Sequence, residues 1–316
     1  MKLTRVVHDY VALKQSMGSR FRTEATILKA FCKAVGDVAI TDVEPQQVAS
    51  YLAGTGPVTR YWHRKYEALS GFYRFALGRG YVTLSPLPKT VPKRPQPFRP
   101  YIFPEEELRR LFKAAGEFET PRMALQGATL RPLLLLLYGA GLRISEAVAL
   151  TRADVDLTAS LLTIHESKFY KTRLVPVGPR LTAALTAYAD DRHRHRQGHL
   201  NNPASPFFVT RTGTAVTRGM AERAFVRLRD IAGIAREDGA RYQPRLHDLR
   251  HAMAVHRLVA WYREGADVQR LLPQLATYLG HVDVAATQRY LAMTPELLRE
   301  ASRRFERYAQ PEVGHE

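Results

Sequence analysis

The side chains best suited to covalent chemistry in this sequence are a histidine and a tyrosine in one short stretch, His281 to Tyr290. A tyrosine held near basic partners can act as a nucleophile. Most such tyrosines, however, only pack against their neighbours with a solvated hydroxyl group. The stretch alone therefore does not establish an active site, and the other basic residues have to be considered with it.

A second candidate is Arg143, which stands where a leucine-rich helix ends and a new helix begins near Ile144. A guanidinium beside a nearly continuous apolar helix has lost freedom and hydration, which suits it to bidentate phosphate binding. An ion pair with Glu146, one turn further on, explains this segment equally well.

A lysine near the tip of a predicted hairpin is the third candidate. Residues 155 to 178 alternate as two strands do, and Lys168 and Lys171 lie near the turn between them. A lysine at a hairpin tip is usually only solvated. If the hairpin reaches a substrate, its ammonium group could protonate a leaving alkoxide.

Two more basic residues follow in the stretch PRLHDLRHAMA. His247 and Arg250 are three positions apart and share one face of a helix, whereas His251 does not share a face with the adjacent Arg250. Metal binding by His247 and His251 is the rival interpretation, but no further ligand supports it. The histidine-rich residues 190–199 likewise indicate a helix end and a solvated loop rather than a metal site.

The composition indicates a polyanionic partner. A formal net charge of +17 and an isoelectric point near 10.1 give self-repulsion that does not help folding, so we expect binding to nucleic acid or an acidic membrane. A general basic bias of the source proteome is the alternative.

The single cysteine, Cys32, excludes a disulfide framework and a thiolate metal site. With no signal-peptide core and no long apolar run, we expect a soluble, cytoplasmic protein that is not associated with a membrane. A DNA partner would place it at the nucleoid.

The pattern of apolar residues predicts a mainly α protein with a small antiparallel β-sheet, an α+β fold in two domains. Residues 1–85 indicate a domain of several short helices. Residues 86–102 are rich in proline and basic residues, which predicts an extended linker. A second domain then covers residues 103–295, and residues 296–316 form a tail with a helical apolar face.

Arginine and lysine interleaved with aromatic residues on helices fit a duplex backbone, because phosphate contacts supply most of the affinity for DNA. For any single residue a solvated helix face is the simpler interpretation, but as a collective surface we expect phosphate binding. The residues predicted to contact DNA in this way are Arg60, Arg64, Lys65, Arg74, Lys93, Arg94, Lys171, Arg218 and Arg223.

Four segments together resemble one known family. GLRISEAVAL, HESKFYKTRLVPV, HDLRHAMA and YLGHVDVAATQRYL occur in this order between about residues 100 and 295. In combination they resemble the tyrosine recombinases, or phage integrase family. The resemblance implies a tyrosine-recombinase catalytic domain there, whereas the N-terminal region resembles the core-binding domain of the family only in helix pattern and charge.

The resemblance also implies a role for each candidate. Tyr290 would attack a DNA phosphodiester to give a 3′-phosphotyrosine and a free 5′-hydroxyl group. Arg143 and Arg250 would hold the non-bridging oxygens. Lys168 would protonate the leaving 5′-oxygen, with Lys171 as the alternative because the tip sequence does not define the register.

Two histidines complete the implied site. His247 would help to deprotonate the tyrosine, and His281 would donate a hydrogen bond to the phosphate. A phosphotyrosine stores the energy of the broken bond, so strand exchange needs no ATP. Two arginines and two histidines can neutralise the charge that a metal would otherwise meet. We therefore expect no cofactor and no metal.

The expected activity is site-specific DNA recombination for the integration, excision or transposition of a mobile element. The alternatives are a Xer-like resolvase of chromosome or plasmid dimers, a catalytically silent DNA-binding accessory protein and a type IB topoisomerase. The segment from Arg250 to His281 is longer than is common in the family, which leaves the subfamily open. The implied partners are double-stranded DNA, three further protomers in a homo- or hetero-tetramer whose contacts involve the tail, and accessory proteins of the same element.

Overall fold

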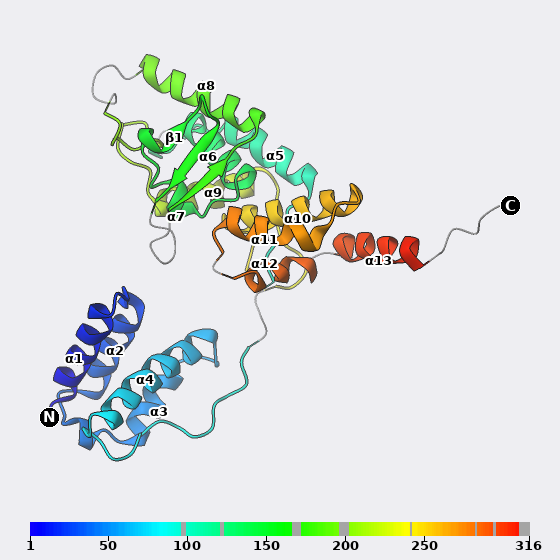
Figure 1. The fold of residues 1–316 in the computed structure, drawn as a ribbon. Coiled ribbons are helices and arrows are strands. Elements are labelled where there is room, and N and C mark those ends of the chain that lie inside the picture. Colours follow the sequence, from blue (N-terminus) through cyan, green and yellow to red (C-terminus); the bar gives the residue numbers. More distant parts are fainter. Residues whose placement is uncertain are drawn as a thin grey trace. The chain divides into compact units, whose positions relative to one another are not determined.

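The computed structural model describes residues 1–95, 99–120, 123–165, 172–195, 202–240, 242–281, 283–292 and 295–309. In this part of the chain helices dominate and one three-stranded antiparallel sheet is present (Figure 1), so the predicted fold class is confirmed. The chain divides into two units, Met1–Phe98 and Arg99–Glu316. This boundary lies inside the segment predicted to be a linker.

The first unit consists of helices packed on a common apolar core. A proline at its first position and a capping box between Glu44 and Gln47 begin α3, and the Thr59 hydroxyl caps α4. Its buried side chains include Leu3, Phe31 and Phe72. The elements are α1 (Leu3–Ser16), α2 (Arg22–Val35), η1 (Ile40–Asp42), α3 (Pro45–Ala53) and α4 (Arg60–Gly78).

The second unit begins with helices around the small sheet. Three glutamates lie in the first turn of α5, where the positive end of the helix dipole stabilises their negative charge. The leucine-rich α6 is buried among α5, α8 and α10. The elements are α5 (Glu105–Gly116), α6 (Gly127–Gly139), α7 (Ile144–Ala147), η2 (Arg152–Asp154), β1 (Val155–Asp156), β2 (Leu161–Ile164), β3 (Arg173–Pro176) and α8 (Pro179–His195).

The sheet has the order β1-β2-β3, and its two longer strands form the predicted hairpin. Leu161 pairs with Pro176 and Ile164 with Arg173. Because directly opposed residues point to the same face, Arg173 lies on the face of the buried Ile164. This register aims a cation from β3 at the interior of the unit.

The remaining helices form a second core in the same unit, where α10 packs against α6, α11 and α13. The helix α11, in the long segment between Arg250 and His281, contains Pro273. No helix in the described residues is long and apolar enough to cross a membrane. The elements are α9 (Arg218–Ile231), α10 (Asp248–Arg263), α11 (Val268–Leu279), α12 (Ala285–Gln288), η3 (Arg289–Ala292) and α13 (Pro295–Ala309).

Candidate active site

Arg250 joins three segments that are far apart in the sequence. It lies in the first turn of α10 and is only 2% exposed. Its guanidinium donates hydrogen bonds to the carbonyl oxygens of Gly141, just after α6, and Leu279, the last residue of α11. Burial, followed by the charge of Arg143, lowers the pKa of Arg250 to about 10, so the group stays protonated at neutral pH.

Two glycines allow these segments to approach one another. Gly141 has a φ of +60°, and a side chain there would collide with Met253 and Leu279. Gly280, with a φ of +66°, ends α11, and a Cβ atom there would lie 2.7 Å from the Arg173 guanidinium. Only glycine combines this backbone conformation with such close packing.

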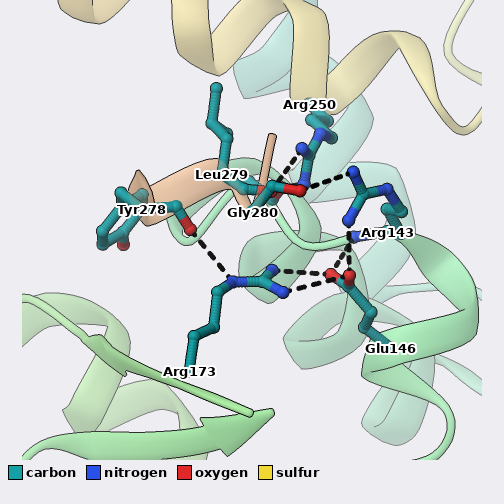
Figure 2. A network of polar contacts seen from close by, with 8 residues as sticks. Arg143, Glu146, Arg173, Arg250, Tyr278, Leu279 and Gly280 are labelled. Carbon is teal, nitrogen blue, oxygen red and sulfur yellow. Dashed lines mark hydrogen bonds and ion pairs between the residues drawn. The ribbon is translucent and has the colours of Figure 1, made fainter. Parts of the chain in front are cut away.

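Arg143 is the N-cap residue of α7, and its side chain remains 28% exposed. Its guanidinium donates to the Glu146 carboxylate at 2.6 Å and to the carbonyl oxygen of Gly280 at 3.0 Å (Figure 2). The ion pair with Glu146, which the sequence offered as the alternative to a phosphate site, is therefore present. The partial exposure of Arg143 leaves part of its guanidinium open to solvent.

Glu146 connects Arg143 to a third arginine, Arg173. The Arg173 guanidinium donates two hydrogen bonds to the Glu146 carboxylate, at 2.8 and 3.2 Å, and one to the carbonyl oxygen of Tyr278 at 3.2 Å (Figure 2). Burial alone would raise the pKa of Glu146, but the hydrogen bonds and charges of Arg173 and Arg143 lower it to about 2. This network holds β3, α7 and the end of α11 in register.

Tyr290 lies in η3 and is 2% exposed. Its hydroxyl oxygen is 3.1 Å from Nδ1 of His251, and its ring stacks on that of His281 at a centroid distance of 6.1 Å. Burial raises the pKa of Tyr290, and this rise is opposed by the charge of Arg250, a hydrogen bond from its guanidinium, and the charges of Arg289 and Arg143. Both candidate phosphate-binding arginines thus act electrostatically on the phenol.

Two histidines, His251 and His281, contact the ring of Tyr290, and a third, His247, contacts the ring of His251. Nδ1 of His281 is 2.7 Å from the hydroxyl oxygen of the buried Thr287, and the ring of His247 stands edge-on to that of His251 at 4.8 Å. Burial is the largest cause that lowers the pKa of each of these histidines to about 4, and nearby charges including Arg250 add to it.

A cavity of about 670 Å³ opens beside this cluster. It lies between α9 and the segment that leads into α10, and Arg143, Arg218, Arg245 and His247 are among its lining residues. A concave, cationic surface of this kind fits a phosphate-bearing ligand. Among the described residues no group of three or more histidine, cysteine or acidic side chains is placed to hold a metal ion.

Comparisons with known proteins agree with this geometry. The profile of the Phage integrase family matches residues 102–296, which include every element of the cluster. The Sinorhizobium fredii integrase/recombinase y4rB is 36% identical over 96% of this chain and 96% of its own. The chain belongs to the phage integrase family. It is accordingly a tyrosine recombinase, a site-specific enzyme that breaks and rejoins DNA.

Two further comparisons extend this result. The tyrosine recombinase XerC of Chlorobaculum parvum is 31% identical, with 82% of this recombinase and 79% of XerC covered. The integrase of the transposon Tn1549, solved in complex with transposon right-end DNA, has a TM-score of 0.70 and 15% identity over 98% of this chain and 100% of that chain. The second likeness shows that the two proteins share a fold.

The structure brings most of the predicted site of the recombinase together. Arg143, Arg250 and Tyr290 converge with His247 and His281, although they come from separate stretches of sequence. Lys168 and Lys171 lie outside the described residues, between β2 and β3.

Sequence reasoning missed His251 and Arg173. The available signal for His251 was its spacing of four from His247, which places both on one helical face but was considered only for metal binding. The signal for Arg173 was its position in the strand alternation with Val175 and Val177, both buried. A cation on the apolar face of a strand indicates a buried polar partner.

The structure corrects one predicted DNA contact, Lys65. This side chain is buried, donates to the carbonyl oxygen of Tyr51 and lies over the ring of that tyrosine, so it is not available on the surface. The other described candidates on α4 and α9 are exposed: Arg60, Arg64, Arg74, Arg218 and Arg223. Two of the candidates in the first unit form exposed ion pairs, Arg64 with Glu24 and Arg94 with Glu67.

Replacing Arg173 should reveal its structural role in the recombinase. In Arg173→Gln the buried Glu146 carboxylate loses its bidentate partner, so we expect a loss of about 3 kcal/mol in the free energy of unfolding. For a unit of this size that is a fall of roughly 10 °C in melting temperature. The control is the double variant Arg173→Gln/Glu146→Gln, which should recover part of the loss. Strictly additive losses would contradict the proposed pairing.

The three histidines should make the DNA-free recombinase sensitive to acid. Their pKa values are lower in the folded protein than in the unfolded chain, where a histidine titrates near 6.5. The unfolded chain therefore binds protons first, and stability should fall as the pH drops from about 6.5 towards 4. Melting temperatures in this range should depend less on pH in His251→Gln/His281→Gln. A double variant that keeps the parental dependence on pH would contradict this assignment.

Proposed function

We propose that the recombinase cleaves DNA through Tyr290, forming a 3′-phosphotyrosine, and that it serves the integration, excision or transposition of a mobile element. The observation that supports the first part most directly is that Arg250 and Arg143 donate to the adjacent carbonyl oxygens of Leu279 and Gly280, directly before His281, whose ring stacks on Tyr290. A phosphodiester beside the hydroxyl group of Tyr290 would meet two guanidiniums able to bind its non-bridging oxygens.

The other members of the cluster have distinct proposed roles. Lys168, or Lys171, protonates the leaving 5′-oxygen. His281 donates a hydrogen bond to the phosphate, since its Nδ1 is already engaged with Thr287. His247 lines the cationic cavity with Arg143, which favours a phosphate contact for it as well. The proposed steps use only side chains of the chain, so we expect activity in EDTA.

The mobile-element role is supported by the integrase/recombinase that matches almost the full chain at 36% identity. The Xer-like alternative is supported by the 31% identity to XerC over a smaller part of the chain. Cleavage assays on candidate element ends and on chromosomal dimer-resolution sites should separate the two roles, since sites are read from groove contacts and DNA shape.

The experiment that tests the chemistry is incubation of the full chain with nicked suicide duplexes in EDTA, followed by denaturing gels and peptide mapping. Covalent attachment of DNA at Tyr290 is the expected result. Verified binding without any adduct, with or without the neighbouring gene products of the element, would favour the catalytically silent DNA-binding protein instead. Relaxation of supercoils without the pairing of two sites would favour the topoisomerase.

Exchange between two duplexes requires four strand cleavages, so with one nucleophilic tyrosine in each protomer we propose a tetramer on paired sites. We also propose that the tail contacts a neighbouring protomer. Leu297 of α13 is buried within its own unit, whereas Leu298 and Phe305 are 55% and 71% exposed. Exposed apolar side chains on one helix are available to a partner protein.

Changing the exposed face of α13 tests the role of the tail. Deletion of residues 296–316, or Leu298→Glu/Phe305→Glu, should abolish the tetramer on DNA but keep the binding of one protomer to one half-site. The double variant retains the buried Leu297, so the packing of α13 on the core of its unit should be unchanged. Sedimentation of the DNA complexes measures the assembly, and Glu306→Gln is the matched surface control. An unchanged tetramer in both altered proteins would exclude the tail as a contact.

A further inference from the structure

His251 holds the hydroxyl group of Tyr290 in the DNA-free enzyme. Its Nδ1 lies 3.1 Å from the phenolic oxygen, and the two rings pack at a centroid distance of 5.6 Å with an interplanar angle of 57°. The contact joins the first turn of α10 to η3, so the imidazole is positioned by a rigid helix rather than by a loop. This is hydrogen-bond geometry between a reacting atom and a side-chain base.

Arg250 also forms a hydrogen bond with the phenol, but as a protonated guanidinium it is a donor and cannot take up the phenolic proton, and the other basic groups are engaged elsewhere. Both terminal nitrogens of Arg250 donate to backbone carbonyls, and Nδ1 of His281 faces the hydroxyl group of Thr287. His247 contacts the ring of His251 rather than a phenolic oxygen. Within the described residues, the histidine nitrogen recorded at hydrogen-bond distance from the Tyr290 oxygen is that of His251.

The surroundings of His251 keep its imidazole neutral. Burial is the main cause, and the charges of Arg250, Arg245, Arg289 and His281 add to it, so that the pKa of His251 is lowered to about 4. A neutral imidazole that carries its proton on Nε2 presents Nδ1 as an acceptor. In this tautomer the imidazole can receive a proton from a phenol at Nδ1.

We propose that His251 is the proton acceptor for Tyr290 during strand cleavage. As the phenolic oxygen bonds to phosphorus, the bond from phosphorus to the 5′-oxygen breaks, and the phenolic proton moves to Nδ1 of His251. The leaving 5′-oxygen receives its proton from the general acid, for which Lys168 is proposed above. Rejoining reverses each transfer, with His251 returning the proton to the released phenol.

Negative charge on the bound DNA phosphate stabilises the protonated form of His251. Protonated His251 would stand among the cations that lower its pKa, which is unfavourable in the DNA-free protein. A bound phosphodiester places negative charge beside the same cations and so stabilises the imidazolium as it forms. Proton transfer is thereby coupled to the presence of substrate. The inference rests on the proposed function, because it requires Tyr290 to be the nucleophile.

The test compares His251→Asn with His247→Asn in single-turnover adduct formation on the nicked suicide duplex. In His251→Asn the side-chain carbonyl can still accept a hydrogen bond from the phenol but cannot take up its proton. We expect cleavage to slow by about 100-fold or more, with DNA affinity retained. The remaining rate should rise about tenfold per pH unit, because only tyrosine that has ionised by itself can react. His247→Asn should keep the pH dependence of the parent.

A second substrate separates nucleophile activation from protonation of the leaving group. A duplex with sulfur at the bridging 5′-position releases a thiolate that needs no proton. This substrate should restore the cleavage rate of Lys168→Ala but not that of His251→Asn. Restoration of His251→Asn by sulfur, or parental rates in His251→Asn and His251→Gln, would overturn the assignment. If the parent formed no adduct at Tyr290, the proposed function itself would fail, which is a distinguishable result.

Discussion

Tyr290→Phe is expected to abolish covalent attachment to DNA while leaving DNA binding intact. The phenolic oxygen is the atom proposed to bond to phosphorus, and phenylalanine has no oxygen to take its place. We expect adduct formation to fall by more than about 1,000-fold, to the background of the assay. The phenyl ring keeps its packing on His281 and His251, so the loss of stability should be about 1 kcal/mol, that of one hydrogen bond.

The matched control is Tyr278→Phe, at a neighbouring tyrosine whose hydroxyl group donates to the carbonyl oxygen of Pro176. This variant should form the adduct at the parental rate. Adduct yields on suicide duplexes and DNA affinities measured at one stated salt concentration provide both readouts. An adduct that survives in Tyr290→Phe would assign the nucleophile to another residue.

Arg250→Lys should reduce cleavage by about 100- to 1,000-fold, the usual effect of removing one preorganised donor to a developing anion. Lysine has a single ammonium group in place of the planar guanidinium group of arginine. It therefore cannot donate hydrogen bonds to the carbonyl oxygens of Gly141 and Leu279 and to a phosphate with the same geometry. Leaving one of these buried carbonyls without a donor should cost a further 1–3 kcal/mol of stability, roughly.

Arg143→Lys is the informative comparison, because burial differs between the two arginines. Arg250 is 2% exposed, whereas the Arg143 side chain is 28% exposed. We therefore expect similar losses of cleavage but a smaller fall in melting temperature for Arg143→Lys. If both variants were equally destabilised and cleaved DNA at the parental rate, the two arginines would stabilise the fold and would not bind the phosphate.

Local pattern was sufficient for much of the architecture. The alternation of apolar residues located the hairpin, and helical spacing indicated the helices of the first unit and the start of α10, because both signals arise within a few neighbouring residues. The break after the leucine-rich helix placed Arg143 correctly at the start of α7. Lys65 shows the limit of this reasoning, since its position on α4 turns it inward onto Tyr51 and away from solvent.

The sequence by itself determined the family, the residue types of the site and their order along the chain, because these are properties of short motifs. Only the tertiary structure decided that His251 faces Tyr290 and that Arg173 shares the Glu146 carboxylate with Arg143. These contacts join residues far apart in sequence. They depend on how helices and strands pack around Gly141 and Gly280, where side chains would collide, and no local periodicity encodes that approach.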